Sequence, residues 1–417
     1  MAVQNRVYPA PAQLPGLRDH CGHVRFVWNL AVEQQSWYWP GRGSAPSSAE
    51  RYRQLTEARQ AEPWLAAGSS SVQQQALRDF DRAMAAFFDP ANPARKPDYR
   101  SRHKVQGFAI RDTTARRLSR RWGEVLVPKV GWVRFRWTRQ LPGKLAVSRV
   151  TCDRAGRWHI SFPAPQPAVK REPAGRSAGI DRGVRTAVVT SDGQHYRAPR
   201  ISGRRAARYL ALQRKLSRQH KRSKNRERTR RQMALISARV TDRRKDWAEK
   251  ISTRLVRDND VIVLEQLNTP GMVRRPEPKP DPDQPGAFLP NRARSKAGLN
   301  RSILASCWGL LGQRLKDKSE ASGVTVLFVD PRFTSQQCHV CGHTQPENRE
   351  SQAVFRCQEC GHLDHADRNA ALNILARGIQ LPATGELIPA HAPGHGAPRL
   401  HQPLATTSAA GTTLEAA

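Results

Sequence analysis

Four cysteines in two closely spaced pairs constrain the fold of this 417-residue chain more than any other feature. Each pair has the form Cys-x-x-Cys, and 15 residues separate the two pairs, which are Cys338 with Cys341 and Cys357 with Cys360. Two such loops place four thiolates at the corners of a tetrahedron, the geometry that Zn²⁺ prefers. Four free buried thiols would leave this spacing unexplained. The sequence therefore predicts one structural zinc site, because four protein ligands leave no open position.

The remaining cysteines and the neighbouring histidines fit this interpretation. Three further cysteines stand alone and are typical of small buried residues: Cys21, Cys152 and Cys307. An odd total of seven with one tight cluster argues against a disulfide scaffold and for a reducing compartment. Three histidines flank the pairs: His339, His343 and His362. With four sulfurs available, we expect these histidines to lie on the surface or to support the ligands from outside.

The charge of the chain predicts its class of partner. Lys and Arg number 70 against 35 Asp and Glu, giving a formal net charge of +35. Solubility alone needs only a few charges, and an excess of this size repels itself unless a polyanion neutralises it. Nucleic acid is the usual polyanion, since basic side chains that contact phosphates release condensed counterions.

Three acidic residues stand where strands end or a helix begins. Asp181 interrupts the apolar strand that starts at residue 178, Glu265 follows the apolar run 261–264, and Asp367 precedes a helix of small residues at 369–375. An RNase H-like fold brings two neighbouring central strands and a packing helix to one cleft. Carboxylate oxygens there would hold Mg²⁺, and two such ions activate the attacking water and stabilise the leaving oxygen. The alternative is that each acid merely caps or ends its own element.

The rest of the chain divides by its periodicity. We expect a small antiparallel β unit at 122–162, joined by a strand at 6–8, and helices at 24–39 and from a cap at Ser69 to Asp89. A Pro-rich linker covers 163–173, a mobile loop 269–300, a helix 303–318 and a strand 324–329. Beyond residue 383 the chain loses periodicity, which predicts a disordered tail at 384–417.

Residues 200–250 form two predicted helices that break near Ser223. This stretch holds 19 basic and four acidic residues, whereas a merely solvated helix face normally mixes both signs. We therefore expect a surface that faces RNA or DNA. Its candidate contact residues are Arg222, Lys224, Arg243, Arg244 and Lys245.

Five motifs in order resemble one known family. They are Gly-Ile-Asp-Arg-Gly at 179–183, Val-Leu-Glu-Gln-Leu-Asn at 263–268, Thr-Ser-Gln-Gln-Cys-x-x-Cys-Gly at 334–342, Cys-x-x-Cys-Gly at 357–361, and Asp-x-Asn-Ala-Ala-x-Asn-Ile at 367–374. The chain is similar over most of its length to TnpB (OrfB) proteins, which are transposon-encoded and similar to the ancestors of type V CRISPR effector nucleases.

The resemblance implies a multidomain α+β architecture. It consists of a wedge-like N-terminal β-barrel (1–20 and 111–172) with a helical recognition insert (21–110), and an RNase H-like (RuvC) α/β nuclease domain (173–332 and 362–383) with an inserted zinc ribbon (333–361). It further implies an RNA-guided, Mg²⁺-dependent DNA endonuclease whose catalytic carboxylates are Asp181, Glu265 and Asp367. A guide RNA from the element would supply sequence specificity by base pairing with double-stranded target DNA beside a short recognition motif.

Two departures from the family pattern and two rival functions remain open. Gln266 stands where the family usually has Asp, and the loop 269–300 is long for the family. A catalytically silent RNA-guided repressor would be expected to lack one of the carboxylates. An RNase H-like transposase would use the same triad to join DNA strands. No run of about 18 apolar residues and no apolar N-terminal core are present, so we expect an intracellular protein without a membrane partner. We further expect a cytoplasmic, nucleoid-associated location in a prokaryote, and we favour a monomer while the oligomeric state stays open.

Overall fold

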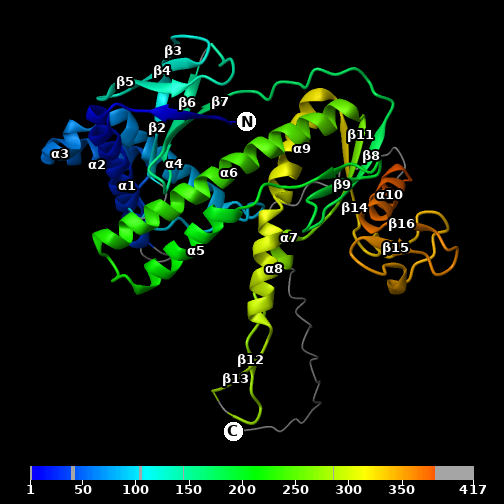
Figure 1. The fold of residues 1–417 in the computed structure, drawn as a ribbon. Helices are drawn as coiled ribbons and strands as arrows, with labels where there is room; N and C mark the ends of the chain where they lie inside the picture. The colour runs from blue at the N-terminus through cyan, green and yellow to red at the C-terminus, as the bar shows by residue number, and fades with distance from the viewer. Residues whose placement is uncertain (1, 39–42, 103–105, 144, 285, 381–417) are drawn as a thin grey trace, which may run out of the picture.

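A computed structural model describes residues 2–38, 43–102, 106–143, 145–284 and 286–380, and two β-sheets organise this part of the chain (Figure 1). The first sheet has the strand order β2-β6-β7-β1-β5-β4-β3 with every described pairing antiparallel. Its strands are β1 (Ala2–Tyr8), β2 (Gln106–Thr113), β3 (Ala115–Arg117), β4 (Trp122–Val127), β5 (Gly131–Arg136), β6 (Leu145–Cys152) and β7 (Trp158–Pro163). β2 contacts β4 although four strands separate them, so the sheet curls into a half-barrel.

Alternation of side chains fixes which face of this sheet is inside. Val133 and Phe135 on β5 are buried, while Arg134 between them is exposed. Val7 of β1 pairs with Phe135 on one side and with Trp158 on the other, which joins the N-terminal strand to the middle of the sheet. The predicted β unit and its N-terminal strand are therefore confirmed.

Helices between β1 and β2 cover the inner face of the half-barrel. They are α1 (Leu14–Ser36), α2 (Ser48–Ala61), α3 (Pro63–Ala67) and α4 (Ser70–Phe88). Ser69 caps α4 as predicted, because its side chain accepts a hydrogen bond from the Val72 N–H. The predicted start of the first helix at residue 24 is wrong, since α1 begins ten residues earlier. Leu17 and Cys21 extend its buried face by the i, i+4 repeat.

The second sheet has the order β10-β9-β8-β11-β14. Its strands are β8 (Ser177–Asp181), β9 (Val188–Thr190), β10 (His195–Tyr196), β11 (Val261–Glu265) and β14 (Thr325–Val329). The three strands β8, β11 and β14 run parallel, and β9 returns antiparallel to β8. On β11, Ile262 and Leu264 pack with the core of helices α6 (Lys224–Asp258) and α9 (Trp308–Ser322), whereas Val263 packs on the opposite face with Ile374. Both faces are covered, which explains the continuous apolar sequence of this strand.

Helix α10 (Ala366–Ile379) packs unusually close to one face of the second sheet. A Cβ atom placed on Gly179 of β8 would lie 2.1 Å from the Ala371 carbonyl oxygen, and one on Gly378 of α10 would lie 2.4 Å from a Val263 methyl group. The two glycines therefore allow the helix to rest almost directly on β8 and β11.

Helices α5 (Gly203–Arg218) and α6 (Lys224–Asp258) form the predicted basic pair, and Ser223 caps α6 at the predicted break. Helix α6 crosses from the half-barrel to the second sheet (Figure 1). Near the half-barrel its Asp242 pairs with Arg157, at 2.5 Å. Near the second sheet its Glu249 pairs with the buried Lys318 of α9, at 2.9 Å. One helix therefore belongs to both halves of the molecule.

The region after β11 differs from prediction. The expected mobile loop 269–300 contains α7 (Thr269–Met272), the short strands β12 (Lys279–Pro280) and β13 (Phe288–Leu289), and the start of α8 (Ala293–Ala305). The single helix expected at 303–318 is two, because α9 (Trp308–Ser322) starts after a break at Cys307. Cys307 has a positive φ of 64°, which ends the α-helical run. α8 and the β12–β13 hairpin project away from the second sheet (Figure 1).

The cysteine-bearing segment lies between β14 and α10. It contains a 3₁₀ turn (Pro346–Asn348) and a two-stranded sheet of β15 (Val354–Arg356) and β16 (Leu363–His365). We call residues 333–361 the ribbon. The tail predicted at 384–417 lies outside the described residues. Within the part of the chain that is described, no helix is long and apolar enough to cross a membrane.

Candidate active site and metal centre

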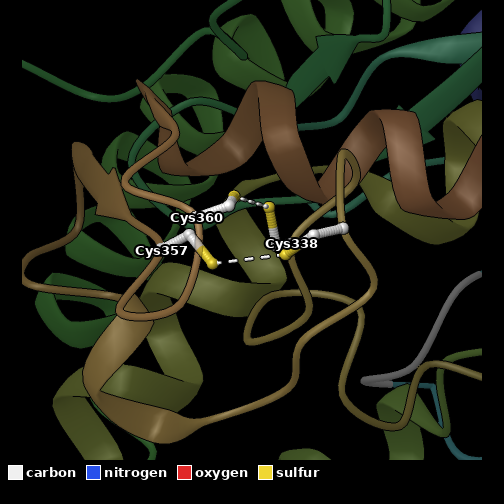
Figure 2. A group of neighbouring side chains, drawn as sticks. Cys338, Cys357 and Cys360 are labelled. Carbon is white, nitrogen blue, oxygen red and sulfur yellow. Dashed lines mark hydrogen bonds between the residues drawn. The ribbon is translucent and has the colours of Figure 1, made fainter.

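The four cysteines of the ribbon converge from two loops (Figure 2). Their sulfur atoms all lie within 4.8 Å of one another, with Cys338 Sγ 3.8 Å from Cys360 Sγ and Cys341 Sγ 3.5 Å from Cys357 Sγ. Zn–S bonds of about 2.3 Å in a tetrahedron separate the sulfurs by about 3.8 Å. The structure therefore brings together the four predicted ligands at distances that fit a zinc site.

Both cysteine loops have the same backbone geometry. Gly342 N–H donates to the Cys338 carbonyl and Gly361 N–H donates to the Cys357 carbonyl, each at 3.0 Å. Both glycines have positive φ, 78° and 71°, a conformation that side chains with a Cβ rarely adopt. Burial opposes ionisation of Cys357, but the backbone N–H groups of the same loop lower the pKa of its thiol to about 6. The second loop thus favours the Cys357 thiolate, whereas in the first loop the pKa values of Cys338, chiefly through burial, and of Cys341 are raised.

The three predicted carboxylates end neighbouring elements. Asp181 is the last residue of β8 and Glu265 the last of β11, and these parallel strands are hydrogen-bonded to each other. Asp367 lies on α10, which packs across both strands. It is inside the first helical turn rather than before the helix, because His365 is the N-cap and its Nδ1 accepts a hydrogen bond from the Asp367 N–H at 3.2 Å. The carboxyl ends of β8 and β11 and the first turn of α10 therefore lie together at one end of the second sheet.

The carboxylates repel one another in this arrangement. Burial, followed by the negative charges of Glu265 and Asp367, raises the pKa of Asp181 to about 8. Burial also raises the pKa of Glu265, although the Thr334 hydroxyl, which donates to Glu265 Oε1 at 2.7 Å, opposes the shift. Among the described residues, the ligand atoms of these three carboxylates do not all lie within 4.8 Å of one another, as the sulfur atoms of the four cysteines do. Their spacing is therefore wider than that of the cysteines.

The predicted nucleic-acid contacts occupy different environments. Arg222 is exposed between α5 and α6, and Lys224 and Arg243 are exposed on α6. Arg244 is half-buried and donates to the Pro199 carbonyl at 3.1 Å, while Lys245 donates to Gln4 on β1 at 3.0 Å. The first three side chains are thus presented to solvent, and the last two also contact neighbouring elements.

Comparison with known proteins places these features in a family. Residues 159–275 match a family model described as "Probable transposase" of the OrfB type, residues 308–374 match the "Cas12f1-like, TNB domain", and residues 1–44 match an OrfB "Helix-turn-helix domain". The chain is 32% identical over 396 residues to a protein of Escherichia coli K12 named "Putative RNA-guided DNA endonuclease InsQ", covering 93% of this chain and 94% of that one. The chain belongs to the TnpB (OrfB) family.

Two further similarities differ in extent. A "Putative RNA-guided DNA endonuclease" of Streptomyces pristinaespiralis is 32% identical to this TnpB-family chain over 391 residues, covering 92% of this chain and 91% of the other. Among solved structures, a Cas12f1–sgRNA–target DNA complex superposes with a TM-score of 0.47 at 11% identity, covering 87% of this chain and 82% of that one.

The surroundings of the carboxylates in this TnpB-family chain include residues that sequence reasoning missed. Arg349 of the ribbon pairs with Asp367 Oδ1 at 3.0 Å, and Arg182 donates to the main-chain carbonyl of Glu265. Thr334 supports Glu265, and Asn373 of α10 in turn donates to the Thr334 carbonyl at 2.9 Å. Thr334 and Asn373 occur within the recognised motifs, which is a signal for their importance. No sequence signal marks Arg349, because its partner is 18 residues away in a differently folded segment.

Proposed function

We propose that this protein is an RNA-guided DNA endonuclease of a transposable element, which hydrolyses target DNA at Asp181, Glu265 and Asp367. The observation that carries the proposal is the meeting of these carboxylates at the ends of two adjacent parallel strands and at the start of the helix that covers them. Family membership supports it, since relatives of nearly equal length carry the same functional name.

The donor set fits hard divalent cations. Three carboxylates supply only oxygen, which Mg²⁺ prefers, and burial, followed by the negative charges of Glu265 and Asp367, raises the pKa of Asp181. Asp181, Glu265 and Asp367 would hold the ions. Bound Mg²⁺ supplies a nucleophilic water and stabilises the leaving oxygen in phosphodiester hydrolysis.

The chain's own residues prepare this site. The Thr334 hydroxyl donates a hydrogen bond to Glu265 Oε1, which leaves Glu265 Oε2 available to a metal ion. Arg182 anchors the Glu265 backbone from the neighbouring strand. Arg349 neutralises part of the charge of Asp367 by its ion pair. The site is thus held in position by groups that do not themselves bind the metal.

The remaining parts fit a guided nuclease. The order β10-β9-β8-β11-β14, with three parallel strands and an antiparallel hairpin, supports an RNase H-like (RuvC) domain at 173–332 and 362–383. We assign the half-barrel to the wedge, the helices between β1 and β2 to the recognition insert, and the ribbon to target nucleic-acid binding. The boundaries expected from the sequence, 1–20 and 111–172 for the wedge and 21–110 for the insert, cut through α1 (Leu14–Ser36) and β2 (Gln106–Thr113). The basic face of α5, α6 and their connection would contact RNA or DNA backbone, and the candidates Arg222, Lys224, Arg243 and Lys245 are exposed on it.

Co-expression with the DNA that flanks the gene, followed by sequencing of co-purified RNA, tests the proposal first. The RNA is then reprogrammed and assayed for Mg²⁺-dependent cleavage of plasmids that carry random bases beside a matching target. We expect cleavage only at guided targets that share one flanking motif. Bound RNA without cleavage would indicate the silent repressor instead, and joining of supplied DNA ends would indicate the transposase.

A variant pair tests the assignment of the site. Asp181→Ala is expected to abolish cleavage while RNA-dependent target binding persists, because the substitution removes a metal ligand and leaves the basic surfaces intact. Asp192→Ala changes an exposed carboxylate on the β9–β10 turn that pairs with Arg176, and it should leave cleavage within about twofold of the wild type. Undiminished cleavage by Asp181→Ala would disprove the assignment.

A further inference from the structure

A second group of potential metal ligands lies beside the ribbon. One ligand atom from each of His339, His362 and Asp364 lies within 4.8 Å of the other two. The imidazole rings of the two histidines meet edge to face, with their centroids 4.6 Å apart. His339 belongs to the first cysteine loop and Asp364 to β16, so different segments contribute to the group.

One nitrogen in this group lacks a partner. His362 Nε2 is buried and has no hydrogen-bond partner among the described residues. It lies 3.9 Å from Asp364 Oδ2, which is too long for a hydrogen bond. Two ligand atoms that bind the same ion at about 2.1 Å each are separated by roughly 3 to 4 Å. The distance therefore suits a shared cation better than a direct contact.

The other two ligands are oriented from outside the group. Asn369 Oδ1 accepts a hydrogen bond from the His339 backbone N–H at 3.1 Å and lies 2.9 Å from His339 Nδ1. A proton on Nδ1 would complete this second bond and leave Nε2 as the free ligand atom. Arg368 donates to Asp364 Oδ2 at 3.0 Å, and the His365 N–H donates to Asp364 Oδ1 at 2.7 Å. Metal-binding histidines and carboxylates characteristically have such supporting partners.

We propose that His339, His362 and Asp364 bind a divalent transition-metal ion at a site separate from both the cysteines and the carboxylates. Two imidazoles with one carboxylate favour Zn²⁺, Co²⁺ or Ni²⁺ over Mg²⁺, which prefers oxygen ligands alone. Because the side chains are only half-buried, water completes the coordination. The proposal does not depend on the nuclease assignment.

Such an ion would join the ribbon to the helix that carries Asp367. His339 is adjacent to the zinc ligand Cys338, and Asp364 is on the strand that leads directly into α10. Asn369, which orients His339, is itself on α10. The ion would thus hold the first cysteine loop, β16 and the first turn of α10 in one arrangement.

Titration of the full-length protein with Co²⁺ tests the proposal, starting from protein whose metals have been removed under reducing conditions. The Asp181→Ala background disables the carboxylate site, so that any second equivalent of metal belongs elsewhere. We expect two equivalents of Co²⁺ per chain. The tighter one should show the sulfur-to-cobalt charge-transfer absorption of a thiolate site, and the weaker one only the faint bands of nitrogen and oxygen ligands.

Ligand variants locate the second equivalent. His362→Ala and Asp364→Asn should each weaken it by more than about tenfold and leave the thiolate absorption unchanged, which also shows that the ribbon remains folded. The matched control is His343→Ala, since His343 is in the same ribbon but contacts Gln345 instead, at 3.0 Å. A single equivalent in the parent protein, or a second one that neither ligand variant weakens, would overturn the proposal. Should one variant lose the thiolate absorption, the other decides the outcome.

Discussion

Replacement of Asp181 by Asn should stabilise the metal-free carboxylate site. The substitution keeps the size of the side chain and removes the charge that Glu265 and Asp367 oppose. The pKa of Asp181 rises from 3.8 to about 8 on folding, chiefly through burial. An acid with a raised pKa in the folded state destabilises that state above its unfolded pKa, and the penalty grows with pH until the folded pKa is reached.

The magnitude follows from the interval between the two pKa values. At pH 7 about three pH units separate the solution from the unfolded pKa, and each unit corresponds to about 1.4 kcal/mol, so the protonation of Asp181 that accompanies folding costs about 4 kcal/mol. The buried amide of Asn retains part of the desolvation penalty, and we expect a net gain of about 2 kcal/mol. That gain corresponds to a rise in Tm of about 4 to 8 °C.

Thermal unfolding of the zinc-loaded protein in Mg²⁺-free buffer measures the effect between pH 4 and pH 8.5. The difference in Tm between Asp181→Asn and the wild type should rise with pH, from a lower Tm for the variant at pH 4, where only the penalty of the buried amide applies, to its largest positive value near pH 8. Asp192→Asn, at an exposed position, should show no comparable trend. Added Mg²⁺ should stabilise the wild type and have little effect on Asp181→Asn. A Tm difference that does not change with pH would refute the reasoning.

Two further substitutions test the packing and the hydrogen bonding around the site. Gly179→Ala should lower the free energy of unfolding in urea by more than about 2 kcal/mol, because the new Cβ would meet main-chain atoms of α10. Gly309→Ala, whose Cβ would have no atom within 4 Å, should be neutral or stabilising. Equal effects of the two substitutions would contradict the close packing. Thr334→Val should lower the free energy of unfolding by about 1 to 2 kcal/mol and reduce cleavage, because Glu265 loses its hydrogen bond. An unchanged urea midpoint would show that this hydrogen bond contributes nothing to stability.

The sequence predicts well what depends on local spacing. The Cys-x-x-Cys pairs define their loops within a few residues, and the structure brings all four sulfurs together. Apolar runs that end in Asp181 and Glu265 predict buried strands, and both strands are present with these residues at their ends. The wedge and recognition boundaries and the roles of the carboxylates stay predictions.

What the sequence does not predict depends on contacts between distant segments. The pairing of Arg349 with Asp367 needs the ribbon to fold back on α10, and nothing near Arg349 marks it among the other arginines. The break between α8 and α9 depends on a positive φ at Cys307, a residue type that carries no turn signal. The helical pattern continues across this position, so periodicity alone predicts one helix.

Helix α6 has a mechanical consequence. At 35 residues it is about 50 Å long, and its two ion pairs, Asp242 with Arg157 of the half-barrel and Glu249 with Lys318 of α9, lie seven residues or about 10 Å apart along the helix. Two turns of α6 therefore couple the two halves of the molecule. A rotation of one half against the other must break one of these ion pairs or bend the helix between Asp242 and Glu249.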